Sequence, residues 1–188
     1  ADQVSSAPNN WEDLISKGVK LPINPGGDPY LMQAVQSSFG VQLFQKSETG
    51  EYSGKLALAG EPGLKFATWL RGNSMDFPQL DYTAATELFV TGQTPCWYTG
   101  MWAIPAIKER VTFNLTAYPM PSAGGEVASP FGASRAFFLN SNSEHPDQAN
   151  ALLELLASDS AQQLIFETTG RQPVTDVFQG EIQDPVMR

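Results

Sequence analysis

The chain has 188 residues, 41% of them apolar, and a formal net charge of -9 at pH 7. This length and composition suit one good-sized globular domain, or a domain and a half, and exclude disordered and collagen-like chains. Twenty acidic side chains against eleven basic ones would repel phosphate backbones, which argues against nucleic acid as a partner. No apolar run approaches the roughly 18 residues of a membrane-spanning helix.

Helix and strand signals alternate along the chain, which predicts an α/β fold. In chain order the expected elements are a helix over 11–17, a strand over 19–24, a helix over 29–39, a hairpin or loop over 45–58, helices over 61–73 and 83–90, a strand over 94–99, a helix over 101–110, strands over 111–121 and 135–140, and helices over 146–158 and 160–169.

Several helix boundaries are marked by capping residues. Asn10 precedes the first helix and Asp13 stands three residues later, in a capping-box-like position. Asp28 caps the next helix and is followed by a proline at the first helical position. At the end of the chain, Asp159 is the expected cap of the last helix and Gly170 its expected stop.

The chain holds one cysteine, Cys96, and one histidine, His145. These counts exclude an internal disulfide framework and multi-histidine zinc sites. A catalytic Cys/His pair is disfavoured because His145 lies in a polar segment where it opens a helix, and Cys96 is expected to be a buried apolar residue. No phosphate-binding glycine loop occurs. We therefore expect no catalytic Cys/His pair, no metal site and no cofactor.

Aromatic residues carry the main chemical signal. Trp97, Tyr98 and Trp102 crowd around a predicted strand-to-helix junction, and Tyr30 lies at another helix start, beside Asp28. Aromatic faces stack on the apolar faces of sugar rings, while carboxylates and amides hydrogen-bond the hydroxyls at the ring edge. This combination indicates a neutral carbohydrate ligand.

The alternative for each aromatic residue is that it fills the core. Trp11 and Trp69 stand at helical core spacing, so we expect them to be buried. Of the neighbours at 97–98, alternation on a strand would point one inward and one outward. Trp102 follows Gly100 at a helix start, where ligands meet backbone N–H groups, which favours a binding role.

An ordered set of motifs resembles a known family. It runs from APNNWEDL near the start through TAATELFVTGQTPCWYTGMWAIPAIKE and VTFNLTAYPMP to HPDQANALLELLASDSAQQLIFETTGRQPV. The helix ending in F-x-x-G, the G-x-W helix start, the strand with its two prolines and the final G-x-x-P follow the order of the extracellular solute-binding proteins of sugar-importing ABC transporters. The chain is similar to the maltose-binding-protein-like group of this family.

The resemblance implies a two-lobed fold of the type II periplasmic binding proteins, in which ligand closes a cleft between α/β lobes. This chain is expected to be an incomplete part of it, with a mixed sheet and flanking helices. Residues 1–131 would form the second lobe, 132–170 a hinge crossover and an excursion that packs on the first lobe, and 171–188 the start of the return segment.

The resemblance also implies which residues bind the ligand. Trp102 matches the family's sugar-stacking tryptophan and Asp28 with Tyr30 match an acidic-Pro-aromatic segment, while the crossover at 132–135 and the loop at 170–172 would approach the ligand. The expected ligand-binding residues are Trp102, Tyr30, Asp28, Gly100, Arg135, Ser134 and Arg171.

The function expected from the resemblance is non-enzymatic binding of a di- or oligosaccharide for an ABC importer. Two alternatives stay open: a charged polyol such as a glycerol phosphate, since an arginine fork suits phosphate, and a glycoside-acting enzyme. A third is an interaction module without a small ligand.

The resemblance has implications for partners and location. The family's first lobe has no counterpart here, so we expect an apolar face that the missing lobe or a second copy covers. The membrane permease of the transporter would be a further partner. The chain begins at Ala1 rather than Met, from which we expect a removed leader or a longer parent chain, and an extracytoplasmic location, periplasmic or as a cell-surface lipoprotein.

Overall fold

The structure is a computed structural model that describes residues 4, 6–17, 28–74, 80–174 and 186. The chain divides into two compact units. Unit 1 comprises Ala1–Thr99 with Tyr118–Phe131, and unit 2 comprises Gly100–Ala117 with Gly132–Arg188. The strand predicted over 19–24 lies outside the described residues.

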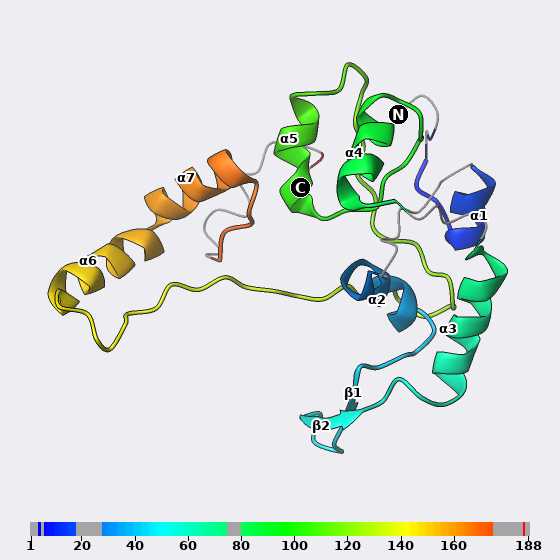
Figure 1. The fold of residues 1–188 in the computed structure, drawn as a ribbon, viewed down its shortest axis with the longest axis horizontal. Helices are drawn as coiled ribbons and strands as arrows, with labels where there is room; N and C mark the ends of the chain where they lie inside the picture. The colour runs from blue at the N-terminus through cyan, green and yellow to red at the C-terminus, as the bar shows by residue number, and fades with distance from the viewer. Residues whose placement is uncertain (1–3, 5, 18–27, 75–79, 175–185, 187–188) are drawn as a thin grey trace. The chain divides into compact units, whose positions relative to one another are not determined.

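Unit 1 contains helices and one small sheet (Figure 1). Its described elements are α1 (Trp11–Ser16), α2 (Pro29–Ser37), β1 (Phe44–Lys46), β2 (Tyr52–Leu56), α3 (Glu61–Gly72) and α4 (Tyr82–Val90). The two strands pair antiparallel, with Phe44 opposite Leu56 and Lys46 opposite Tyr52, which confirms the predicted hairpin. The helices predicted for this unit are likewise confirmed.

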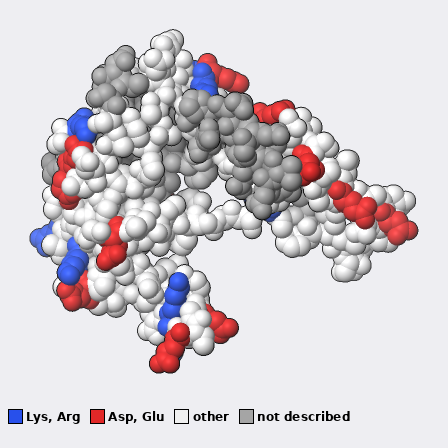
Figure 2. Space-filling view, turned by 180° about the vertical axis from the view of Figure 1, so that it is seen from behind, with Lys and Arg blue, Asp and Glu red and all other residues white. Residues whose placement is uncertain are grey.

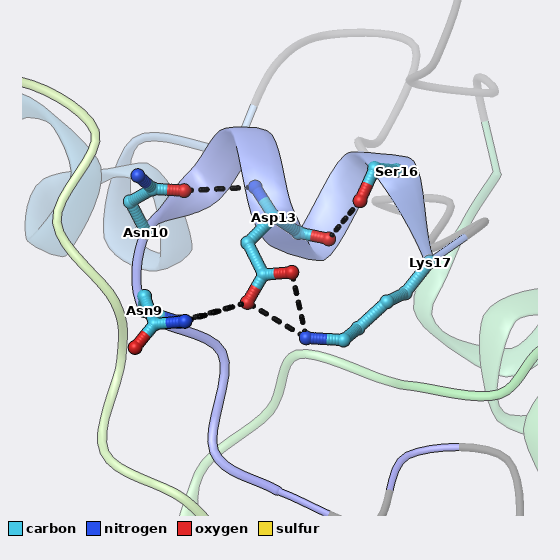
Figure 3. Close-up of polar contacts among 5 residues, drawn as sticks. All are labelled: Asn9, Asn10, Asp13, Ser16 and Lys17. Atoms are coloured by element: carbon cyan, nitrogen blue, oxygen red, sulfur yellow. Dashed lines mark hydrogen bonds and ion pairs between the residues drawn. The ribbon is translucent and has the colours of Figure 1, made fainter.

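Side-chain caps explain where these helices begin. Asn10 Oδ1 accepts from the backbone N–H of Asp13 at 2.8 Å, and Asp28 Oδ1 accepts from that of Leu31 at 3.0 Å. The Asp13 carboxylate does not bond back to Asn10; Figure 3 shows it accepting instead from Asn9 and Lys17. The capping-box expectation is therefore right for Asn10, while Asp13 joins a wider network around the same turn.

The core of unit 1 lies between α1 and α2. Its buried residues are Trp11, Leu14, Met32 and Val35. Trp69 of α3 packs edge-on against Trp11, with ring centroids 5.7 Å apart. The two tryptophans expected at core positions are thus both part of this cluster, with Trp11 fully buried and Trp69 only partly so.

The segment around residues 123–124 is hydrogen-bonded to the C-terminal end of α2. Buried Ser38 accepts hydrogen bonds through its hydroxyl from the backbone N–H groups of Ala123 and Gly124, at 3.1 and 3.0 Å. A Cβ on Gly124 would collide with backbone atoms of Ser38 and Phe39. Glycine is needed here because the two backbones approach so closely.

Unit 2 is mostly helical. Its described elements are the 3-10 helix η2 (Met101–Ala103), α5 (Ile104–Lys108), α6 (Pro146–Ala157) and α7 (Asp159–Thr169). Ile104 is buried against Met101, Phe166 and Val186, whereas α6 and α7 hold no buried residue of their own. Gly170 ends α7 in the left-handed conformation, at φ 67°, as predicted.

Three predicted strands are wrong. Within the described ranges the only paired strands are β1 and β2, so 94–99, 111–121 and 135–140 are not strands. Residue alternation favours an extended backbone, but a strand also needs a neighbouring backbone to pair with, and prolines in the first two segments remove N–H donors.

Two helix boundaries also differ from the prediction. Ser158, not Asp159, caps α7, because the Ser158 hydroxyl accepts from the backbone N–H of Ala161. The helix predicted over 101–110 divides into η2 and α5, and Pro105 falls in the first turn of α5, where the missing N–H costs nothing.

Candidate functional site

One candidate site in unit 1 lies at the start of α2. Asp28 occupies the N-cap position and Pro29 the first turn, so the chain turns sharply into the helix. This places Tyr30 in the first turn with 45% of its surface exposed. On the same helix, Met32 and Val35 are buried in the core. The helix is therefore anchored by its buried side and presents the Tyr30 ring to solvent.

The Tyr30 ring is stacked on Phe131. The two ring centroids lie 5.8 Å apart and the planes make an angle of 30°. Phe131 is itself 39% exposed, so the contact leaves aromatic surface open on both residues. The sequence prediction did not include Phe131. Its signal is the SPFG stretch, in which Phe131 directly precedes the predicted crossover at Gly132.

Tyr98 belongs to the same neighbourhood. Burial, followed by the charges of Asp28 and Tyr30, raises the pKa of Tyr98 to about 12. The phenol is therefore neutral at physiological pH and retains its proton for hydrogen bonding. Sequence reasoning placed Tyr98 in an aromatic cluster but did not select it as a binding residue.

Trp97 and Cys96 pack against other residues of unit 1. Trp97 contacts Tyr82 and Phe89 of α4, with ring centroids 5.2 and 5.9 Å away. Tyr98 instead packs against the core of unit 1, so the neighbouring rings do meet different surroundings. Cys96 packs on that same core, and burial raises the pKa of its thiol. A less ionised thiol is a poorer nucleophile, in agreement with the expected packing role.

A second candidate site, in unit 2, is built from Gly100 and Trp102. Gly100 precedes η2, and its carbonyl accepts from the backbone N–H of Ala103 at 3.1 Å. The Trp102 ring folds back over Gly100 so closely that a Cβ there would overlap the ring atoms. Trp102 is 44% exposed. Backbone sterics thus define where this half-exposed indole lies.

The remaining predicted residues are exposed positions of unit 2. Ser134 and Arg135 lie in the irregular segment before α6, and Arg171 follows the glycine that ends α7. The Arg171 backbone N–H donates to the Thr169 hydroxyl at 3.3 Å. Across the described residues, no hydrogen bond joins the side chains of Ser134, Arg135 and Arg171 to one another. Their binding roles remain predictions.

The structure thus groups the seven predicted residues into two pairs and three separate positions. Asp28 and Tyr30 share one helix start in unit 1, and Gly100 and Trp102 share one turn in unit 2. Asp28 caps the helix on which Tyr30 stands. Gly100 has no side chain, so the Trp102 indole can lie directly against its backbone.

Unit 2 also exposes apolar side chains. They are Phe137, Phe138 and Leu139 before α6, Leu152 and Leu155 in α6, and Leu164 in α7. Figure 2 shows acidic side chains along the same two helices, which carry no lysine or arginine. The apolar surface expected for residues 132–170 is present.

The described residues show neither a metal-binding cluster nor a helix that could cross a membrane. Among them, no three His, Cys, Asp or Glu side chains gather in a way that would hold a metal ion. None of their helices has the length and apolar character needed to cross a bilayer.

Comparison with known proteins identifies both family and fold. The sequence profile described as "bacterial extracellular solute-binding protein" matches residues 1–163. Among curated proteins, none matches the chain significantly.

Two solved structures illustrate the similarity of fold. The Thermus thermophilus maltotriose binding protein bound with maltotriose is 23% identical with a TM-score of 0.77, and the match covers 99% of this chain and 53% of that chain. A cyclo/maltodextrin-binding protein complexed with maltotetraose is 18% identical with a TM-score of 0.74, at 99% and 52% coverage.

The chain therefore spans about half the length of these structures. They confirm the predicted fold class, an incomplete part of a bilobal binding protein, in which helices and a small sheet are the described elements. The profile covers most of the sequence. This chain belongs to the family of bacterial extracellular solute-binding proteins.

Proposed function

We propose that the chain is part of a non-enzymatic receptor that binds a di- or oligosaccharide for an ABC importer. The observation that carries the proposal is Trp102: a half-exposed indole held against Gly100 at a helix start. A large flat ring with an exposed face suits stacking against the apolar face of a sugar. Family membership and the maltooligosaccharides bound in two structures of the same fold support this ligand class.

Tyr30 supplies the corresponding ring in unit 1. Asp28 caps the start of the same helix, and burial, with the nearby charges of Asp28 and Tyr30, raises the pKa of Tyr98. A carboxylate accepts from sugar hydroxyls and a neutral phenol both donates and accepts, so these groups suit the hydroxyls in the plane of a sugar ring. In the intact protein, ligand contacts made only in the closed state would shift the population toward closure.

The proposal places the protein outside the cytoplasm, where it delivers ligand to a membrane permease. The extracellular description of the family supports this location. Delivery would be tested by adding the intact protein, with and without bound saccharide, to the reconstituted permease and measuring ATP hydrolysis. We expect the saccharide-loaded protein to stimulate ATP hydrolysis. Equal rates of ATP hydrolysis with the loaded protein and without any added protein would contradict the importer role.

The ligand class is tested by thermal shift and calorimetry on the intact protein with maltose, maltotriose, maltotetraose and glycerol 3-phosphate. A ligand that binds only the folded state raises the melting temperature. We expect a rise with at least one saccharide. A rise with glycerol 3-phosphate alone would instead favour recognition through Arg135 and Arg171 and contradict the sugar proposal.

The role of Trp102 is tested by Trp102→Ala and Trp102→Phe. Loss of the ring is expected to weaken saccharide binding at least about tenfold, or roughly 1.4 kcal/mol, whereas phenylalanine retains part of the affinity. Unchanged affinity in Trp102→Ala would contradict the proposed site. Release of reducing ends from the same saccharides by the wild type would contradict a purely binding role.

A further inference from the structure

The stacked pair of Tyr30 and Phe131 joins two segments of unit 1. The two residues are about a hundred positions apart in sequence, yet their rings are nearly parallel, at 30°. Both stay more than a third exposed. Adjacent, exposed aromatic rings leave a continuous apolar surface in water, which is unfavourable unless another molecule covers it.

Backbone hydrogen bonds determine where Phe131 lies. The Ser37 hydroxyl accepts from the backbone N–H of Ser129 at 2.7 Å, and its single hydrogen is shared between the carbonyls of Ala34, at 2.9 Å, and Ser129, at 3.1 Å. Ser38 holds the preceding residues through Ala123 and Gly124. The segment therefore meets the C-terminal end of α2 first.

From that end the segment runs back along the helix. Ser37 and Tyr30 are seven residues apart on α2, or about 10 Å along its axis. Two extended residues after Ser129 cover about 7 Å, and two aromatic side chains bridge the rest. The fastening of Ser129 thus places Phe131 beside the first turn of α2, where Tyr30 projects.

The contact with Phe131 also restricts the rotamer of the Tyr30 side chain. An aromatic ring in the first turn of a helix has open space on its solvent side and can adopt more than one rotamer. Contact with Phe131 favours the rotamer that stacks. A ring already ordered before binding loses less conformational freedom when the ligand arrives, which raises affinity.

We propose that Phe131 is a positioning residue for Tyr30: it stacks on one face of that ring and leaves the other face for a sugar ring. This inference rests on the proposed function, because it concerns the same ligand. It adds a residue from a second segment of unit 1 and explains why that segment is fastened to α2.

The test measures maltotriose and maltotetraose affinity of the intact protein by calorimetry for wild type, Phe131→Leu, Phe131→Tyr, Tyr30→Leu and the double variant Tyr30→Leu/Phe131→Leu. We expect Phe131→Leu to weaken binding about three- to tenfold and Phe131→Tyr, which keeps a ring, to restore it. Once Tyr30 is replaced, removing Phe131 should have a smaller effect, because the two side chains act together.

Phe44→Leu serves as the matched control. Phe44 is exposed to a similar extent, 36%, and lies in the hairpin of the same unit. It should bind like wild type. Thermal unfolding without ligand separates binding from folding: the loss of affinity in Phe131→Leu should exceed any fall in melting temperature shared with Phe44→Leu.

Two results would overturn the inference in different ways. If wild type binds and Phe131→Leu binds equally well, or if the two leucine substitutions are simply additive, Phe131 does not position Tyr30 while the proposed function stands. If wild type binds neither saccharide, the proposed function for this ligand class fails and the inference fails with it.

Discussion

The two units hold their exposed aromatic rings by different means. In unit 1, Tyr30 stands on a helix that also buries Met32 and Val35, so packing of the core fixes the helix that carries the ring. In unit 2, Trp102 stands in a short 3-10 turn and rests on the backbone of Gly100. One ring is positioned by tertiary packing, the other by local sterics.

The two units also differ in how much apolar surface they bury. Unit 1 joins α1, α2 and α3 around buried tryptophan, leucine, methionine and valine. In unit 2 the described cluster is centred on Ile104, and α6 and α7 expose their leucines. Because burial of apolar surface drives folding, unit 1 should carry most of the stability of this chain. Substitutions of matched type in the two units test that conclusion.

The largest effect is expected from Trp11→Ala. Trp11 is fully buried, so its removal leaves a cavity and should lower the free energy of unfolding by about 3–5 kcal/mol. Trp102→Ala removes the same side chain from a half-exposed position and should lower the free energy of unfolding by a smaller amount, about 1 kcal/mol. Chemical denaturation of both variants measures the contrast. Similar losses would show that unit 2 contributes more stability than its burial indicates.

A smaller effect is expected from alanine at two glycines. Gly124→Ala drives a methyl group into the backbone of Ser38 and Phe39, which cannot swing aside, so stability should fall by about 1–3 kcal/mol. Gly100→Ala meets only the ring of Trp102, which can rotate away. It should therefore leave stability nearly unchanged but weaken saccharide binding.

Gly54→Ala, in the hairpin of unit 1, is the control for both substitutions, because a Cβ at that position meets nothing within 4 Å. It should match wild type in unfolding and in saccharide affinity. Wild-type saccharide affinity in Gly100→Ala would show that the position of the Trp102 ring does not depend on the glycine. Local sterics would then not distinguish unit 2 from unit 1.

The elements that sequence predicted well are those with local signals. Caps at Asn10 and Asp28, and the glycine that ends α7, are recognised by neighbouring residues in the chain, so the helices they bound were foreseen. The strands over 94–99 and 135–140 were not confirmed, because alternation in one segment contains no information on whether another segment lies beside it.

The same reasoning explains what was foreseen at the candidate site. Tyr30 and Trp102 were selected because each follows a helix-start signal within two residues. Phe131 was missed because its partner is about a hundred residues away and the link depends on serine hydroxyls bonding a distant backbone. The sequence predicts Gly100 as a ligand contact. The structure shows a different reason for glycine at this position, because a Cβ would overlap the ring of Trp102.

The smallest effect compares two helix caps. Asn10→Ala removes the oxygen that accepts from Asp13 N–H and should destabilise the chain by about 1 kcal/mol, because α1 contributes Trp11 and Leu14 to the core. Ser158→Ala removes the corresponding oxygen of α7, a helix without a buried residue. Its loss should fray α7 locally and leave the main unfolding transition in place. Denaturation followed by tryptophan fluorescence measures both variants.

The pH dependence of this transition offers a second readout of the α1 cap. The hydrogen bond from Lys17, together with that from the Asn9 backbone, lowers the pKa of Asp13 below its ordinary value of 3.8. Stability from this carboxylate is thus present above that value and is lost as the pH falls through the lower pKa of the folded state. Asp13→Asn should flatten this acid-side decline, while Ser158→Ala should leave it unchanged. An equal decline in Asp13→Asn would mean that the network in Figure 3 does not couple to the core, and that α1 is held by Trp11 and Leu14 alone.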